Sequence, residues 1–176
     1  LNYIMESLSY INEQLLNEKI YLSYKETNTK DINNNIYNIL VEKVENKCYM
    51  NGYTVKGTLK LINKTMGKLV KLDTENKILY NIRFSVKILQ PSVNDIIECY
   101  VDNINKMGII AYVKFKDILK DYDENNTLKE SPFIIIVPMQ SIKDIENINI
   151  GQKIKIKVNA TRIKFNADKI QIVGEI

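Results

Sequence analysis

Residues 95–115 read DIIECYVDNINKMGIIAYVKF, in which two runs of strand-forming residues, 95–104 and 108–115, are joined by a short turn at Met107-Gly108. Three more strand candidates follow at residues 132–137, 153–163 and 169–173. A polar, acid-bearing stretch occupies residues 117–130, and residues 140–146 could form a helical turn before Gly151. Five short strands between residues 92 and 176 predict a small closed Greek-key barrel of the OB type.

The chain changes character at Gln90-Pro91-Ser92, because proline cannot continue a central strand. We therefore expect a domain boundary at about residue 90. Strands are expected before it at residues 53–62, 68–72 and 78–89, with turns at Asn51-Gly52 and at residues 63–67. The fold class is α+β, because a helix also precedes these strands. That helix starts after the capping residue Asp31 and ends near residue 46, and its apolar face carries Ile32, Ile36, Ile39, Leu40 and Val44.

The N-terminal stretch shows two further patterns. Ile4, Leu8, Ile11 and Leu15 follow helical spacing and predict an amphipathic helical extension over residues 1–18. Residues 19–25 are rich in strand formers and predict a strand, followed by a polar turn at residues 26–30. The expected organisation is therefore a helical extension at 1–18, an α+β domain at 19–90 and a barrel at 91–176. Because the first residue is leucine, the true start of the protein is left open, with Met5 as one candidate.

Composition excludes several kinds of catalytic site. The chain has no histidine and only two cysteines, so hydrolase triads and multi-thiolate zinc modules are ruled out. It also lacks a glycine-rich phosphate loop and the aspartate-rich motif that holds the two metals of a polymerase. We expect no catalytic residue, no metal and no cofactor. Four acids could suggest a cation site, but they lack the pattern of a calcium loop, and a solvated loop is favoured: Asp117, Asp121, Asp123 and Glu124.

No membrane partner is expected. The longest apolar run, residues 133–137, is too short to cross a bilayer, and Glu6 and Glu13 interrupt any secretory signal. An intracellular or particle-enclosed protein is therefore the default. Cys48 and Cys99 could form one disulfide, but in a chain without a secretory signal reduced thiols are favoured.

Charge placement indicates a nucleic-acid partner more strongly than the net charge of +4, because the abundant lysine and asparagine also reflect A/T-rich codons. Lysines at 153, 155 and 157 alternate with aliphatic residues, which places three ammonium groups on one face of a strand. Residues 149–173 contain six basic residues and one acid. Such a row can follow RNA phosphates, and the alternative is a solvated barrel face. The expected RNA-contacting residues are Lys106, Tyr112, Lys153, Lys155, Lys157, Arg162, Lys164 and Phe165. For the aromatic residues the alternative is packing in the core or at the rim.

The second half resembles an S1-type OB domain in the order and spacing of five segments. These are VNDIIECYV at 93–101, NKMGIIAYV at 105–113, VPMQSI at 137–142, IGQKIKIKV at 150–158 and DKIQI at 168–172. Where a typical S1 domain stacks bases, this chain has Met107, Ile110 and Pro138. The usual stacking platform is therefore absent.

The first half carries VENKCYMNGY at 44–53 after a strand and a helix, and FSVKILQP at 84–91 before the barrel. Over residues 19–176 this arrangement is similar to the stalk subunit of multi-subunit DNA-dependent RNA polymerases, the seventh subunit of eukaryotic RNA polymerase II and its archaeal counterpart. The resemblance implies a tip domain followed by an S1-like barrel. It also implies a non-catalytic role, with the large polymerase subunits and nascent RNA as partners. The docking segment that it implies comprises Cys48, Tyr49, Met50, Asn51, Gly52 and Tyr53, although the family is richer in glycine there.

The resemblance leaves some alternatives open. A second stalk subunit is the family's usual partner, and whether this polymerase has one stays open. The departures fit a divergent homologue, such as one from a large DNA virus, which would place the protein in the nucleus, or in a cytoplasmic viral factory and the virion. The alternative function is a free-standing S1/OB protein that binds RNA in translation or RNA metabolism. A third is an interaction module whose barrel never contacts RNA.

Overall fold

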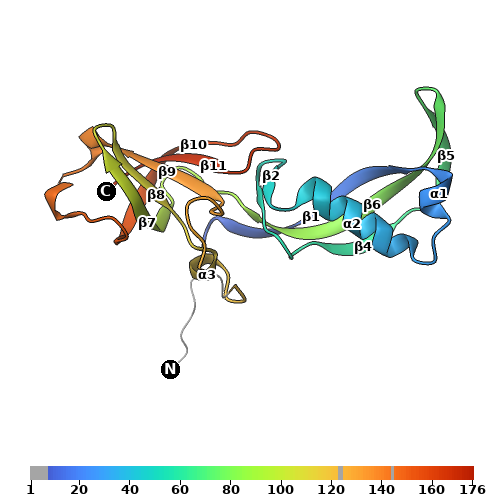
Figure 1. Cartoon of the computed structure of the whole chain (residues 1–176), viewed down its shortest axis with the longest axis horizontal. Helices are drawn as coiled ribbons and strands as arrows, with labels where there is room; N and C mark the ends of the chain where they lie inside the picture. The colour runs from blue at the N-terminus through green and yellow to red at the C-terminus, as the bar shows by residue number, and fades with distance from the viewer. Residues whose placement is uncertain (1–7, 123–124, 144) are drawn as a thin grey trace. The chain divides into compact units, whose positions relative to one another are not determined.

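The computed structural model describes residues 8–122, 125–143 and 145–176 (Figure 1). The chain forms two compact units. The barrel unit contains Leu89–Ile176 together with two earlier segments, Asn46–Tyr53 and the described part of Leu1–Ile11. The sheet unit contains Asn12–Glu45 and Thr54–Ile88.

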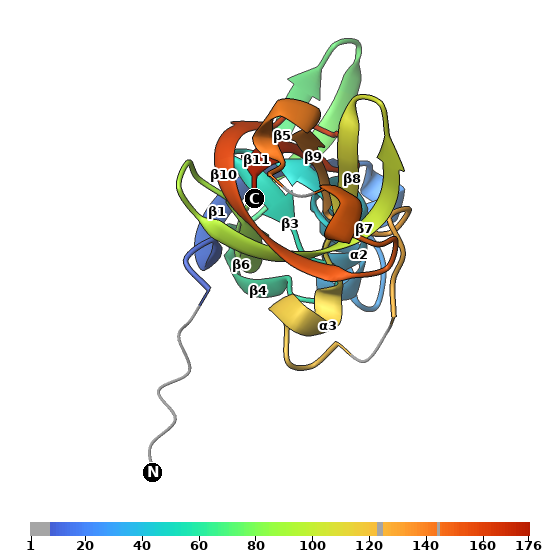
Figure 2. The ribbon, with the colours of Figure 1, turned by 90° about the vertical axis from the view of Figure 1, so that its left-hand side faces the viewer.

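Within the described residues, five strands close into a barrel in the order β10-β11-β9-β8-β7 (Figure 2). Their bounds are β7 (Ile96–Asn105), β8 (Gly108–Tyr112), β9 (Phe133–Pro138), β10 (Lys153–Arg162) and β11 (Ile170–Glu175). Strands β9 and β11 run parallel, and the other neighbours are antiparallel. The predicted closed five-stranded barrel is confirmed, and it is compatible with an OB-fold.

Alternation along the strands fills the barrel with aliphatic side chains and one aromatic ring. The buried set is Ile97, Cys99, Val101, Ile109, Ala111, Phe133, Ile135, Val137, Ile154, Ile156, Val158, Ile170 and Ile172. Both cysteines of the chain are buried free thiols, so the disulfide alternative is wrong for this structure. Burial raises the pKa of Cys48 to about 11 and that of Cys99 to about 12.

Two buried polar side chains hold the connection between β8 and β9, which includes the short helix α3 (Phe115–Ile118). The Asn126 side chain accepts from the Phe115 N–H at 2.8 Å and donates to the Val113 carbonyl at 3.0 Å. The Ser131 hydroxyl accepts from the Val113 N–H at 3.2 Å. After β9, the expected helical turn is present as two 3₁₀ turns, η1 (Met139–Ser141) and η2 (Ile145–Asn147).

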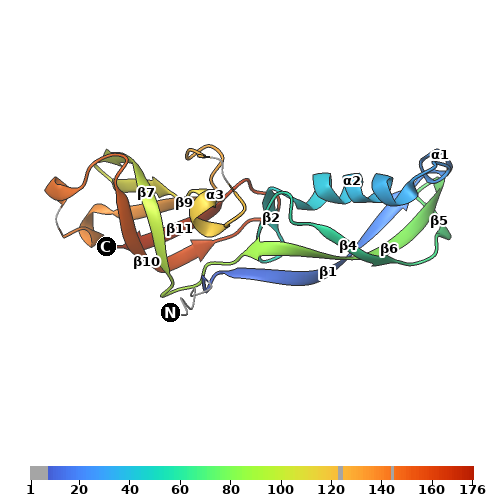
Figure 3. The same cartoon turned by 90° about the horizontal axis from the view of Figure 1, so that it is seen from below.

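The sheet unit places one helix against a strand-rich framework (Figure 3). The long strand β6 (Glu75–Leu89) pairs with β1 (Ile11–Leu22) and, antiparallel, with β4 (Lys60–Lys64) and β5 (Lys68–Leu72). Helix α2 (Ile32–Val44) confirms the predicted helix, because the Asp31 side chain accepts from the Asn34 N–H at 3.0 Å. Ile36, Leu40 and Val44 form its buried face. Two short strands, β2 (Lys47–Tyr49) and β3 (Gly52–Thr54), follow the helix, and their residues up to Tyr53 belong to the barrel unit.

The predicted N-terminal helix is wrong over residues 11–18, which belong to strand β1. Burial there has a period of two: Ile20 and Leu22 are buried, whereas Leu15, expected on the apolar helix face, is 56% exposed. Pairing with β6 stabilises this segment as a strand, whereas a short amphipathic helix is only marginally stable on its own. Residues 1–7 of the predicted helix lie outside the described residues.

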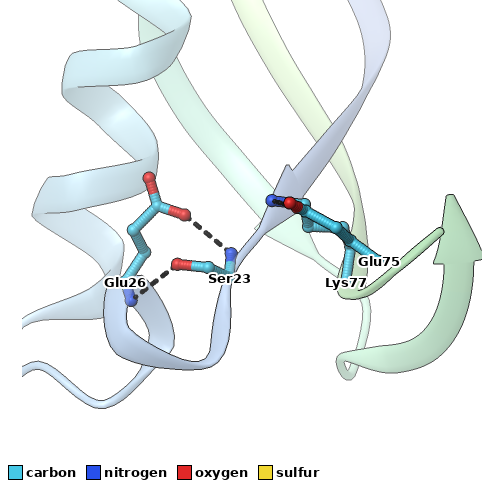
Figure 4. A network of polar contacts seen from close by, with 4 residues as sticks. All are labelled: Ser23, Glu26, Glu75 and Lys77. Carbon is cyan, nitrogen blue, oxygen red and sulfur yellow. Dashed lines mark hydrogen bonds and ion pairs between the residues drawn. The ribbon is translucent and has the colours of Figure 1, made fainter. Parts of the chain in front are cut away.

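The strand expected over residues 19–25 ends at Leu22, and one helical turn, α1 (Tyr24–Thr27), follows. Ser23 and Glu26 form a capping box: the Ser23 N–H donates to the Glu26 carboxylate at 2.6 Å, and the Glu26 N–H donates to the Ser23 hydroxyl at 3.4 Å (Figure 4). Figure 4 also shows the ion pair between Glu75 and Lys77, 2.8 Å long. The Ser-x-x-Glu spacing is a known helix-start signal, so this turn was readable from the sequence.

Glu45 anchors the loop after β3 to the end of helix α2. Glu45 is 5% exposed, and its carboxylate accepts from the N–H groups of Gly57 and Leu59, each at 3.0 Å. Glu45→Ala leaves the buried Leu59 N–H without an acceptor, so we expect the free energy of unfolding to fall by about 2–4 kcal/mol. Urea denaturation measures the change. Glu13→Ala, at an exposed position of β1, is the control with an expected change near zero, and equal losses in both variants would contradict the anchoring role.

Candidate nucleic-acid interface

The lysine row on β10 has the predicted geometry. Lys153, Lys155 and Lys157 are exposed, and the intervening Ile154, Ile156 and Val158 point into the barrel. Each lysine also faces a glutamate on a neighbouring strand. The Glu98 carboxylate is 2.7 Å from the Lys153 ammonium and 3.5 Å from the Lys155 ammonium, and Glu175 is 3.5 Å from Lys157. The row therefore carries three cations and two anions.

The electrostatics of this row follow from those contacts. The hydrogen bond from Lys153 lowers the pKa of Glu98, and the same bond raises the pKa of Lys153. Exposed ion pairs of this kind contribute little to stability and are screened by salt, so a phosphate can compete with Glu98 for the lysines. Glu98 and Glu175 lie outside the 149–173 window, and for that reason the local sequence count overstated the positive charge.

A hollow of about 500 Å³ opens beside the lysine row. Lys143, which follows η1, lines it together with Lys155 and Lys157, so three lysines border one space. The remaining lining residues are Ile96, Gln140, Ser141, Ile156, Glu175 and Ile176. Lys143 was not among the predicted residues, because it lies outside the basic window of residues 149–173.

Two tyrosines lie next to the row, on the outer face of β7 and β8. Tyr100 and Tyr112 are paired in register, with ring centroids 6.0 Å apart and an interplanar angle of 34°. The Lys114 ammonium is 4.2 Å from the centroid of the Tyr100 ring, and the Lys153 ammonium is 5.9 Å from it. We call these four residues the tyrosine cluster. Partly exposed aromatic rings beside cations are what proteins use to bind single-stranded nucleic acid.

The phenols of the cluster stay neutral at physiological pH. Burial and the Asp117 side chain raise the pKa of Tyr100, and burial raises that of Tyr112. Of the cluster, the sequence predicted Tyr112 and Lys153. Tyr100 and Lys114 were missed. The signal for Tyr100 was its place between Cys99 and Val101, which face inward. Because side chains alternate along a strand, Tyr100 faces outward on the predicted strand over residues 95–104.

Other predicted RNA-contacting residues lie elsewhere on the barrel unit. Lys106 is exposed in the β7–β8 turn, at the opposite end of that hairpin from Tyr100 and Tyr112. Arg162, Lys164 and Phe165 lie at the end of β10 and in the loop that follows, and all three are exposed. Lys169 was part of the basic count, but its ammonium donates to the carbonyls of Lys129 and Ser131 at 2.6 and 2.8 Å. Lys169 therefore has a structural role, which is to hold the backbone at Lys129 and Ser131.

The segment predicted to dock on the polymerase packs within the barrel unit. The Cys48 N–H donates to the Ala167 carbonyl and the Asn166 N–H donates to the Cys48 carbonyl, both at 2.8 Å. The Tyr49 ring lies 5.9 Å from that of Phe165. Tyr53 lies 6.4 Å from Phe115, measured between ring centroids, and its hydroxyl donates to Asn46 at 2.7 Å.

Burial separates the six residues of that segment. Cys48, Tyr49, Gly52 and Tyr53 are buried, and Met50 and Asn51 are exposed. Tyr49 and Tyr53 cannot anchor a partner without leaving their own barrel unit. A docking role for this segment stays a prediction that depends on the two exposed residues.

Residues considered for other chemistry are placed as follows. Asp117 and Asp121 are exposed, and Asp123 and Glu124 lie outside the described residues. Among the residues that the structure describes, no group of three potential metal ligands comes together. No helix in the described ranges is both long and apolar enough to span a membrane.

No protein-family model matches the chain, and a search of curated proteins finds no match.

Proposed function

We propose that the protein is a non-catalytic stalk subunit of a DNA-dependent RNA polymerase whose S1-like barrel contacts the nascent transcript. The observation that carries the proposal is the order of its parts: a strand, a capped helix and antiparallel strands precede Pro91, and a closed five-stranded barrel follows. This is the order of tip domain and S1-like domain in the stalk family. The partly exposed tyrosine cluster and the exposed lysine row give that barrel a surface for RNA.

RNA contact in this proposal uses aromatic side chains that adjoin the usual S1 platform, because Tyr112 follows Ile110 on the same outward face of β8. Met107, Ile110 and Pro138 occupy the usual stacking positions, and none of them is aromatic. Tyr112 and Tyr100 supply the aromatic surface instead, where stacking is worth about 1–3 kcal/mol per base. The lysine row supplies phosphate contacts whose strength falls with salt.

The RNA surface is tested by two variants. Tyr112→Leu keeps an apolar side chain but removes the ring, so we expect single-stranded RNA affinity to fall by about 5- to 100-fold. Replacing Lys153, Lys155 and Lys157 with glutamine should reduce the slope of log affinity against log salt by about 2. Fluorescence anisotropy with a labelled RNA oligonucleotide over a salt series measures both. Lys25→Gln, on α1, is the control, and unchanged affinity in both test variants would refute RNA contact at this surface.

The stalk role is tested by affinity purification of the tagged protein from its native source, followed by mass spectrometry. We expect two large polymerase subunits in stoichiometric amounts. Recovery of the protein alone, or with ribosomal components, would refute the stalk role and support the second candidate, a free-standing RNA-binding protein. The observation that favours this second candidate is the burial of Cys48, Tyr49, Gly52 and Tyr53 within the barrel unit.

A further inference from the structure

The hollow beside β10 is built by three neighbouring strands of the barrel. The register places Lys157 directly opposite Ile96 on β7 and opposite Glu175 on β11, so these three side chains form one row across the sheet. Ile156, which is 1% exposed, also lines the hollow, so the space reaches down to the barrel core. Its volume of about 500 Å³ is typical of a pocket that holds one small ligand or one end of a larger one.

The charges around this space are unevenly matched. Among the described residues, three lysines and one glutamate line it, and we call it the lysine hollow after Lys143, Lys155 and Lys157. Lys155 and Lys157 are each 3.5 Å from a carboxylate, a longer contact than the 2.7 Å pair of Lys153. Lys143 takes part in no ion pair with another described residue. An anion in the hollow can therefore engage Lys143 directly and compete with two long, exposed ion pairs.

Two uncharged polar side chains also line the lysine hollow. Gln140 and Ser141 both belong to η1. Neither side chain forms a hydrogen bond with another residue that the structure describes, so the amide and the hydroxyl are left for a ligand. Lysine, glutamine and serine side chains are among the groups that proteins use to bind phosphate oxygens. The donor set of the hollow therefore fits a phosphate group.

Three lysines favour a phosphate that carries more than one negative charge. An internal phosphodiester of RNA carries a single charge, whereas a terminal phosphate carries about −1.5 to −2 at pH 7. A multiply charged group gains more from the three lysines, and it therefore better offsets the loss of the pairs that Glu98 and Glu175 make. The described lining residues include no aromatic ring, so the hollow has no surface on which to stack a base.

We propose that the lysine hollow binds the terminal phosphate of a nucleotide, as the 5′ end of an RNA or as a free nucleoside triphosphate. The tyrosine cluster is close enough to hold the same RNA, because Lys157 lies four residues beyond Lys153, about 13 Å along β10. The hollow would then give the barrel a preference for the phosphorylated ends of transcripts. The RNA form of this proposal rests on the proposed RNA contact, and the free-nucleotide form does not.

The test compares three single-stranded RNA oligonucleotides of one sequence, which carry a 5′-triphosphate, a 5′-monophosphate or a 5′-hydroxyl. Fluorescence anisotropy of a label at the 3′ end measures the affinity of the full chain for each. We expect the triphosphate form to bind about 5- to 20-fold more tightly than the hydroxyl form. Lys143→Gln should remove most of this preference and leave the affinity for the hydroxyl form unchanged. Lys116→Gln, on α3, is the matched control and should keep the wild-type preference.

Glu175→Gln should act in the opposite direction. The substitution removes the carboxylate that faces Lys157 and keeps a side chain of similar size, so we expect the preference for the triphosphate form to rise by at least about threefold. A gain of this kind cannot result from a variant that fails to fold. Tyr112→Leu, by contrast, should weaken binding of all three RNAs by the same factor and leave the preference intact.

Isothermal titration calorimetry with ATP separates the two sources of the phosphate. ATP binding that Lys143→Gln weakens would support the free nucleotide as a source, even if the wild-type protein bound none of the RNAs and the proposed RNA contact failed. A triphosphate preference without ATP binding would support the RNA end. Equal affinity for the three RNAs, together with no binding of ATP, would overturn the inference and leave the RNA contact standing. No binding of any RNA or of ATP would overturn both.

Discussion

Replacing Gly108 with alanine is expected to lower the free energy of unfolding of the barrel by at least about 3 kcal/mol. Gly108 begins β8 with a φ of +136°, a conformation that residues with a Cβ rarely adopt. A Cβ there would lie 2.0 Å from the carbonyl oxygen of Val137 and 3.0 Å from the backbone nitrogen of Met139. Both are backbone atoms of the β9 end, so the strands themselves would have to separate.

Gly151→Ala separates the contribution of the positive φ from that of the close backbone contacts at Gly108. Gly151 also has a positive φ, +83°, but nothing lies within 4 Å of a Cβ built there. Its substitution should cost only the backbone contribution, about 1 kcal/mol. Guanidinium denaturation of both variants measures the difference. Equal losses at the two glycines would contradict the close approach of β8 and β9 as the cause.

Phe133→Ala is expected to cost about 3–5 kcal/mol of folding free energy. Phe133 begins β9, is fully buried inside the barrel and packs edge-on against Tyr10, with ring centroids 5.9 Å apart. Removing the ring loses the transfer free energy of its buried atoms. It also leaves a cavity between β9 and the N-terminal segment, which lowers the stability further.

Phe165→Ala is the matched control for Phe133→Ala. Phe165 is 64% exposed and contacts Tyr49 at the surface, so its replacement should cost less than about 1 kcal/mol. Thermal unfolding followed by circular dichroism ranks the two variants. A control as damaging as Phe133→Ala would show that the β10–β11 loop, rather than the barrel interior, carries the stability.

The barrel was predictable from sequence because each of its strands is a short run of strand formers bounded by turn residues. The α2 helix was equally clear, because Asp31 and the spacing of Ile36, Leu40 and Val44 agree. Strand β1 could not be predicted from the sequence, because Ile11 and Leu15 also fit helical spacing. Its true period is visible only once β6 supplies a partner, which is a contact between residues far apart in the sequence.

The candidate site was predictable only in part, for the same physical reason. The outward face of β10 followed from alternation, but the pairing of its lysines with Glu98 and Glu175 depends on cross-strand register. The register also places Tyr100 beside Tyr112. Residues 48–53 look like an interface in the sequence because tyrosine and methionine are common in interfaces. The same residue types also fill cores, and here Tyr49 and Tyr53 are buried.

Polymerase isolated through a tag on one of its large subunits, rather than on this chain, tests the stalk role most directly. Native mass spectrometry after ribonuclease treatment then gives the number of copies of this chain per enzyme. We predict one copy, retained without RNA, because docking uses protein contacts. Absence of the chain from the isolated polymerase would contradict the stalk role. Its complete loss on ribonuclease treatment would also contradict that role, because the barrel would then be held only by the transcript.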